Sequence, residues 1–142
     1  MICAAEDVGL ADPQALNVAV SASLAAERLG LPEARIVLSE AALYVACAPK
    51  SNTAIRAIDE ASRCVEEVKT TVPVHLQDAH YKGAAKLGHG SGYQYAHDYP
   101  MHYVEQQYLP DEVADRSFYH PTENGYEQKI REHFRVLKGN NQ

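Results

Sequence analysis

The first half of this chain is divided by helix start and stop signals. Asp12-Pro13 is a typical helix start, because an aspartate caps free N–H groups and proline suits the first helical position. The pattern predicts a helix from there to about Leu29, closed by Gly30. Residues 1–68 contain no alternation of apolar and polar residues of strand length. The sequence therefore predicts an all-α protein.

The faces of these helices predict how they pack. One face of the first helix carries small and aliphatic residues, which allow a neighbouring helix to come close. They are Leu16, Ala19, Val20, Ser23, Ala26 and Leu29. A second helix, over 36–48, is apolar on nearly every side and ends at Pro49. A helix without a polar face is usually buried, so we predict that this one is central.

The remaining segments are assigned from caps and periodicity. Residues 1–9 are predicted to be the end of a preceding helix, and 10–68 to be the core helices, with Ser51 or Asn52 capping the third. The apolar face of that third helix is Ile55, Ile58, Ser62, Val65 and Val68. Residues 69–121 are predicted to hold a short helix, from His75 to Leu87, and a long irregular aromatic segment. Thr122 is predicted to cap a last helix over 122–138, and we take 1–142 as one domain.

The irregular segment is rich in glycine, histidine and tyrosine. Residues 83–92 hold four of the eight glycines of the chain. Glycine permits positive φ or close backbone approach, and each tyrosine brings a large apolar ring with a hydroxyl. The residues that we expect to shape this loop are Gly83, Gly88, His89, Gly90, Gly92 and Tyr93.

Charge and cysteine content narrow the function classes. Thirteen Lys and Arg against nineteen Asp and Glu give a net charge of -6, which argues against a protein devoted to non-specific binding of phosphate backbones. Lys82 and Lys86 are four residues apart in the predicted short helix, where they could contact an anion or DNA, although a solvated helix face is the commoner role. Cys3, Cys47 and Cys64 are distant from one another and are predicted to be reduced core residues.

The sequence contains no recognisable motif for catalysis or for cofactor binding. The five histidines between residues 75 and 102 are separated by five, nine, eight and five positions, which does not favour convergence on one metal ion. Gly88 to Gly92 lacks the lysine and hydroxyl residue that follow the glycines in a P-loop. We therefore predict no catalytic residue, no metal and no cofactor in this chain. A stand-alone metal-dependent hydrolase and a DNA-binding module remain alternative readings.

Several separated blocks together resemble a known family. They are AEDVGLADP at 5–13, APKSN at 48–52, DAHYKGA at 78–84, KLGHG at 86–90, QQYLP at 106–110 and GYE at 125–127. In collinear order they resemble the C-terminal part of the bacterial replication-associated recombination protein A (RarA, also called MgsA) family. These are AAA ATPases related to clamp loaders and akin to Werner-helicase-interacting protein. Family members commonly carry a lysine where Ala85 stands here and a tryptophan near Tyr103.

The resemblance implies a role in assembly. It implies a helical domain similar to a clamp-loader collar, through which ATPase subunits form a homotetramer in replication-fork maintenance, recombination and repair. It further implies that ATP and magnesium bind to an upstream part of the parent protein. DNA, through the parent assembly, and single-stranded-DNA-binding protein are the implied partners. We expect a bacterial, cytoplasmic, nucleoid-associated protein with no membrane partner.

Two surfaces are candidates for self-association. The first is the small-residue face of the first helix, along Leu16, Val20 and Leu24, and the second is the tyrosine-rich segment from Tyr93 to Tyr108. We favour the helical face, because small side chains permit close helix packing.

Overall fold

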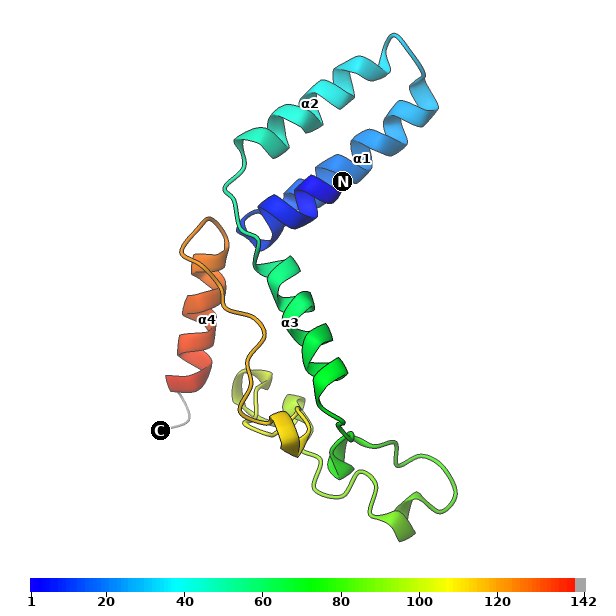
Figure 1. Cartoon of the computed structure of the whole chain (residues 1–142), viewed down its shortest axis with the longest axis vertical. Helices are drawn as coiled ribbons and strands as arrows, with labels where there is room; N and C mark the ends of the chain where they lie inside the picture. Colours follow the sequence, from blue (N-terminus) through cyan, green and yellow to red (C-terminus); the bar gives the residue numbers. More distant parts are fainter. Residues whose placement is uncertain (140–142) are drawn as a thin grey trace. The chain divides into compact units, whose positions relative to one another are not determined.

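The computed structural model describes residues 1–139, which form helices and turns and contain no strand. The prediction of an all-α fold is confirmed. The α-helices are α1 (Gln14–Leu29), α2 (Ala34–Cys47), α3 (Thr53–Glu67) and α4 (Glu127–Gly139) (Figure 1). Shorter helical turns are η1 (Ala4–Val8), η2 (Gly9–Ala11), η3 (Val74–Leu76), η4 (Ala84–Leu87), η5 (Ala96–Asp98), η6 (Pro100–His102) and η7 (Asp111–Val113).

The contacts of the chain group it into two compact units. The first unit comprises Met1–Glu60 and Phe118–Arg135, and the second comprises Ala61–Ser117 with the described residues 136–139. We describe these two units one at a time, and the assignment of 1–142 to one domain stays a prediction.

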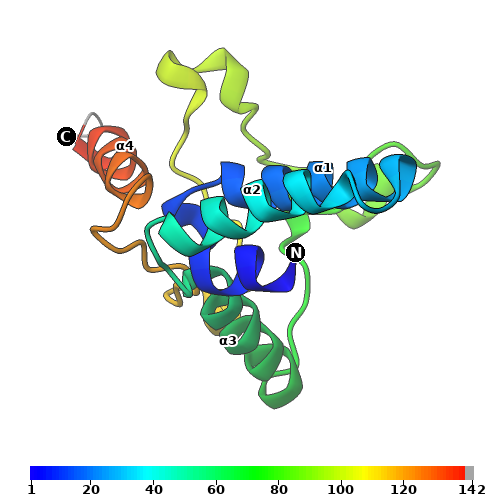
Figure 2. The same ribbon diagram turned by 90° about the horizontal axis from the view of Figure 1, so that it is seen from above.

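The centre of the first unit is the antiparallel hairpin of α1 and α2. Both views show the two helices side by side (Figures 1 and 2). Asp12 caps α1 as predicted, since its Oδ1 accepts a hydrogen bond from the Gln14 N–H at 3.0 Å. Gly30, with φ of 70°, ends α1 at the predicted place. The Tyr44 hydroxyl donates to Asp12 Oδ2 at 2.9 Å and so ties the end of α2 to the start of α1.

The hydrophobic core of this unit is small. Ala4 and Val8 of η1 and Ala15 of α1 are buried together, and Ala19, Val45 and Ala48 pack against them. Most of these side chains are single methyl groups, which let the backbones approach but bury little apolar area each. The large aliphatic residues of the α1–α2 hairpin, apart from Val45, are not part of this core.

The C-terminal part of the first unit is held against its N-terminal part by backbone contacts. The Tyr126 N–H donates to the Ala11 carbonyl at 2.7 Å, and the Ser51 N–H donates to the Asp7 carbonyl at 2.9 Å. At Gly125, where φ is 53°, an added Cβ would lie 2.1 Å from the Ala11 oxygen. Glycine is therefore required at this position by both conformation and space.

The last helix begins later than predicted. α4 starts at Glu127, and Thr122 does not cap it. The hydroxyl of Thr122 accepts the Asn124 N–H at 3.1 Å and lies 2.5 Å from the carboxylate of Glu127, so it orders a loop before the helix. Gly139, expected just beyond the helix, is its last residue.

The second unit contains no continuous helix from His75 to Leu87, and that prediction is wrong. The segment forms the separate turns η3 and η4. Asp78 Oδ1 accepts the backbone N–H of His80 at 2.9 Å, a side-chain bond that competes with helix formation. Gly83 then takes φ of 107°, which no α-helix contains.

The rest of the second unit is held by side-chain amides more than by apolar packing. Gln106 accepts the Gln94 N–H at 3.0 Å and donates to the Gln94 carbonyl at 3.2 Å, as a β-strand neighbour would. The Tyr99 hydroxyl donates to the Gln94 side chain at 2.8 Å. Val104 and Val113 are buried. This segment is irregular, as the sequence predicts, and its path is fixed by specific polar bonds.

The three cysteines are free, as predicted, but they are not all core residues. Cys64 is buried, whereas Cys3 and Cys47 are exposed. The prediction for these two is wrong because the hydrophobic core is small, and the alanine-rich segments around Cys3 and Cys47 leave both side chains at the surface.

Candidate functional site

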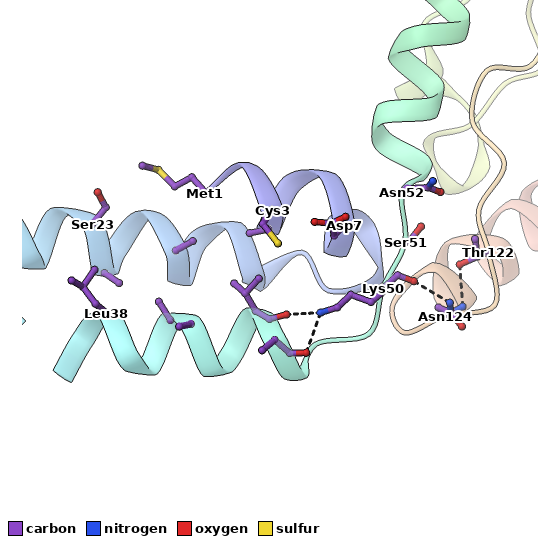
Figure 3. A pocket seen from close by; sticks show the side chains of 17 residues that line it. Met1, Cys3, Asp7, Ser23, Leu38, Lys50, Ser51, Asn52, Thr122 and Asn124 are labelled. Atoms are coloured by element: carbon purple, nitrogen blue, oxygen red, sulfur yellow. Dashed lines mark hydrogen bonds between the residues drawn. The ribbon is translucent and has the colours of Figure 1, made fainter. Parts of the chain in front are cut away.

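The main hollow of the first unit is a groove between α1, α2 and η1. Its volume is about 1000 Å³, and its sides are mostly apolar (Figure 3). The walls come from Ala19, Ala22 and Ser23 of α1, from Leu38, Ala41, Ala42, Val45 and Ala46 of α2, and from Met1, Cys3, Ala4 and Asp7. Alanines on facing helices leave this space because their methyl groups do not fill it.

The predicted oligomer face borders this groove. Leu16, Val20 and Leu24 are 37% to 50% exposed and stand next to the groove residues Ala19 and Ser23 around α1. From Gln14 to Ala26 the sequence contains no charged residue, even at exposed positions. Charge depletion of this kind is typical of the centre of a protein interface and unusual for a helix that faces water.

The helix predicted to be central, α2, is largely exposed, and that prediction is wrong. Ala34 and Ala41 are buried against α1, but Ile36 is 67% and Leu43 is 63% exposed. α2 packs mainly on α1, and in the described residues of the first unit no further layer covers its other sides. Contacts inside this unit therefore leave much of the apolar surface of α2 exposed.

Polar groups gather at one end of the groove. The Lys50 ammonium donates to the carbonyls of Val45 at 2.5 Å and Ala46 at 3.2 Å, the free acceptors at the end of α2 (Figure 3). The Asn124 side chain donates to the Lys50 carbonyl at 3.0 Å. The positive charge of Lys50 thus binds the carbonyl end of α2, the helix that precedes it, and marks one limit of the apolar surface.

Ser51, at this polar end of the groove, bonds to a buried carboxylate that the sequence does not reveal, that of Glu127. Glu127 is fully buried at the first turn of α4. Its oxygens accept from Ser51 Oγ at 2.9 Å, from the Thr122 N–H at 2.9 Å and from the Tyr119 hydroxyl at 3.1 Å. Hydroxyl donors from Thr53 and Thr122 complete the set. We call these residues the Glu127 anchor.

The anchor changes the ionisation of its members. Burial alone would raise the pKa of Glu127, but the hydrogen bonds from Thr122, Thr53 and Ser51 outweigh it and lower the pKa to about 2. Burial and then the charge of Glu127 raise the pKa of Tyr119 to about 12. The carboxylate is therefore charged at neutral pH and fully hydrogen-bonded. It has a structural role, holding the start of α4 to the start of α3.

The apolar face predicted for α3 is not the buried one. Ile58 is 61% and Val65 is 72% exposed, while Thr53 and Cys64 are buried. At about 100° per residue, Ile58 and Val65 point roughly 100° to 120° away from Cys64. α3 thus buries the smaller Thr53 and Cys64 and leaves Ile58 and Val65 uncovered. Ile55 of the predicted face is half-buried.

The lysines proposed for DNA contact do not share a helix face. Lys82 lies in the turn before η4 and Lys86 within η4, and both are exposed. The spacing of four residues aligns side chains in an α-helix but not in these tighter turns, so the predicted pairing on one helix face is wrong.

The loop-shaping residues cluster in the second unit. Gly83, Gly88, Gly90 and Gly92 all have positive φ. An added Cβ at Gly90 would lie 2.7 Å from the Cβ of Ala79, and its N–H donates to the Val74 carbonyl at 2.9 Å.

The aromatic and histidine side chains of this loop contact one another. His89 Nδ1 lies 2.7 Å from the Tyr81 hydroxyl, and Tyr93 is half exposed. His97 lies between Tyr95 and His102, with ring centroids 5.0 Å and 4.9 Å apart. Among the residues described, no group of three or more potential metal ligands converges. The histidines form polar and ring contacts.

Within residues 1–139, no helix is both long enough and apolar enough to cross a membrane.

Comparison with known proteins gives consistent matches. Residues 1–138 match the family described as MgsA AAA+ ATPase C terminal. The chain is 49% identical over 126 residues to Replication-associated recombination protein A of Bacillus subtilis, covering 88% of this chain and 30% of that protein. It is 41% identical over 131 residues to the protein of that name from Escherichia coli K12, covering 91% and 29%.

A eukaryotic relative matches as well. ATPase WRNIP1 of Dictyostelium discoideum is 35% identical over 118 residues, covering 82% of this chain and 14% of that protein. The chain spans less than a third of the length of the curated relatives named here.

Proposed function

The chain belongs to the MgsA AAA+ ATPase C-terminal family, and from this premise we propose that it is the assembly domain of an ATPase of replication-associated recombination. Its task in this proposal is to hold copies of the longer protein together. ATP hydrolysis belongs to the rest of that protein, and we propose that the chain itself neither binds nor hydrolyses ATP. Nucleotide turnover by the purified chain would contradict this part.

One observation carries the proposal: the uncharged, exposed face of the α1–α2 hairpin. Leu16, Val20 and Leu24 border a groove of about 1000 Å³ whose floor is aliphatic. Apolar surface of this kind costs about 25 cal/mol for each Å² left in water. A second protein surface removes that cost, and a domain whose relatives are AAA ATPases has copies of itself available as the partner.

The number of copies is taken from the family resemblance. A clamp-loader-like collar in this family implies four subunits, so we propose a homotetramer. The Glu127 anchor supports such a role, because it fixes the first unit without using the aliphatic side chains of the hairpin.

The test is the mass of the purified chain by light scattering at micromolar concentration. We expect a tetramer, and we expect Val20→Glu to dissociate it because a charge is placed at the rim of the groove. Tyr99→Ala, in the second unit, is the matched comparison and should leave the mass unchanged. A wild-type monomer would defeat the proposal, and dissociation by Tyr99→Ala alone would move the interface to the tyrosine-rich segment.

Contact with DNA is a second part of the proposal. The chain has a net charge of -6, and its exposed cations in the second half include Lys82 and Lys86 and the α4 residues Lys129, Arg131 and Arg135. Few phosphate contacts per copy give weak binding, which several linked copies strengthen. We expect the assembled protein to bind DNA with a steep salt dependence and the Val20→Glu monomer to bind much more weakly. Equal, salt-insensitive binding by both would contradict this.

A further inference from the structure

The groove of the hairpin and the exposed stripe of α3 are two unlike surfaces of the same chain. The stripe consists of Ile58 and Val65, more than 60% exposed, with the exposed Ser62 between them and the half-buried Ile55 at its start. The groove is concave and the stripe is a convex row of branched side chains. Both are apolar, so the two surfaces match in chemistry and are complementary in shape.

The dimensions of the two surfaces agree. The groove residues of α2 extend from Leu38 to Ala46, eight steps along the helix, or about 12 Å at 1.5 Å per residue. The stripe from Ile55 to Val65 covers ten steps, or about 15 Å. One helix laid along the hairpin can therefore place the branched side chains of the stripe over the alanine floor, as ridges fit into grooves between packed helices.

Charge restricts which helix can be the occupant. The groove walls contributed by α1 and α2 contain no ionisable carboxylate or ammonium group. Among the described α-helices, α4 places Lys129, Arg131 and Arg135 on its exposed sides. The exposed row of α1 is itself the rim of the groove. On α2 the exposed Ile36 and Leu43 have the carboxylate of Glu40 between them on the same face. α3 is the helix that offers a long, uncovered stripe without a charged residue in it, and the nearest charged residues, Glu66 and Asp59, lie along one edge of it.

We propose that the Ile58–Val65 stripe of α3 in one copy packs into the α1–α2 groove of a second copy. This inference rests on the proposed assembly function and specifies how the copies are joined. Because donor and receiver are different surfaces, the contact is head-to-tail, and such contacts close into rings when the rotation between copies allows. Four copies in a ring would satisfy every groove and every stripe.

Head-to-tail joining has a diagnostic consequence in mixtures of variants. Ile58→Glu places a carboxylate in the stripe and leaves the groove intact. Ala42→Glu places a carboxylate in the groove and leaves the stripe intact. Both positions are exposed in the single chain, so the fold of each variant should be retained. We expect each variant alone to have monomer mass at micromolar concentration and an equimolar mixture to form a dimer through its one intact pair of surfaces.

The control is Gln128→Glu, which adds the same charge at an exposed position of α4 and should keep the wild-type mass. A mixture that stays monomeric would overturn the inference, as would Ile58→Glu with an undiminished wild-type mass. If Ala42→Glu dissociates the protein and Ile58→Glu does not, the occupant is another surface. A wild-type monomer would instead count against the assembly function itself. The milder Ile58→Ser and Ala42→Gln test the same outcomes if a glutamate variant fails to fold.

Discussion

The Glu127 anchor buries a carboxylate, whereas the hairpin face exposes aliphatic side chains. This is the reverse of the usual distribution of polar and apolar residues. Glu127, a carboxylate, has no exposed surface, whereas Leu16 and Leu24 are 41% and 50% exposed. Several hydrogen bonds replace the water that the carboxylate loses, so its burial is tolerated. Within the first unit, polar bonds therefore fix the chain path, and aliphatic side chains remain for contact with another surface.

The largest effect that would sharpen this comparison is expected from Glu127→Ala. The change leaves the hydroxyls of Ser51, Thr53 and Tyr119 without their acceptor and opens a cavity, so we expect a loss of about 3–5 kcal/mol in the free energy of unfolding. Denaturant unfolding followed by circular dichroism measures it. Glu132→Ala, at an exposed position of the same helix, should change stability by about 0.5 kcal/mol or less. Equal effects would show that the anchor is not what fixes α4.

A second large effect is expected at Gly125. Alanine there must adopt a positive φ and push its Cβ against the Ala11 carbonyl, so Gly125→Ala should lower the unfolding free energy by about 2 kcal/mol or more. Gly139→Ala is the matched control, because no atom of the described residues lies within 4 Å of its added Cβ. If both variants unfold at the same denaturant concentration as wild type, the close approach at Gly125 is not needed for the fold.

An effect of intermediate size is expected in the stability of the fold at acid pH. The pKa of Glu127 is lowered from 4.5 to about 2, so its ionised form stabilises the folded state. That contribution is fully present above about pH 4.5 and is lost as pH falls toward 2. Thermal melts of Glu127→Gln should therefore lie below those of wild type at pH 6, and the gap should narrow between pH 4.5 and 2. A gap that is constant over this range would exclude the anchor carboxylate as the titrating group.

The helices and the Glu127 anchor differ in how far the sequence predicts them. The start of α1 at Asp12 and its end at Gly30 follow from local capping and were predicted correctly. The apolar faces of α2 and α3 were recognised, but their burial was assigned to the chain itself. Periodicity indicates that a helix has an apolar face that is stabilised by burial. It does not show whether the same chain or another chain buries that face.

The Glu127 anchor was missed because its members are far apart in sequence. Ser51 and Glu127 are 76 positions apart, and a glutamate near a helix start usually faces water. The local signals present were the hydroxyl residues Ser51 and Thr122, which predict helix caps rather than partners of a buried carboxylate. In the second unit, the helix predicted at 75–87 failed because the Asp78 side-chain bond and the conformation of Gly83 outweigh helix propensity.

The smallest effect on stability is expected on the hairpin face. Leu24→Ser removes a half-exposed side chain, so the free energy of unfolding of the single chain should fall by about 1 kcal/mol or less. Its effect on assembly should be much larger, with a dissociation constant raised about tenfold or more. Comparing monomer melts with light scattering separates the two quantities. A large loss of stability without any change in mass would place Leu24 in the internal core.

The most direct measurement of the central claim, that another copy covers the hairpin groove, uses the wild-type cysteines. Cys3 lines the groove, and Cys47 is exposed and is not among the groove residues. The hydrogen bond to Asp7 raises the pKa of the Cys3 thiol, so alkylation by iodoacetamide is best followed at mildly alkaline pH. As the protein concentration rises through the assembly transition, we predict that alkylation of Cys3 slows about tenfold or more while that of Cys47 changes little. A Cys3 rate that stays constant while the mass rises to that of the oligomer would contradict the account.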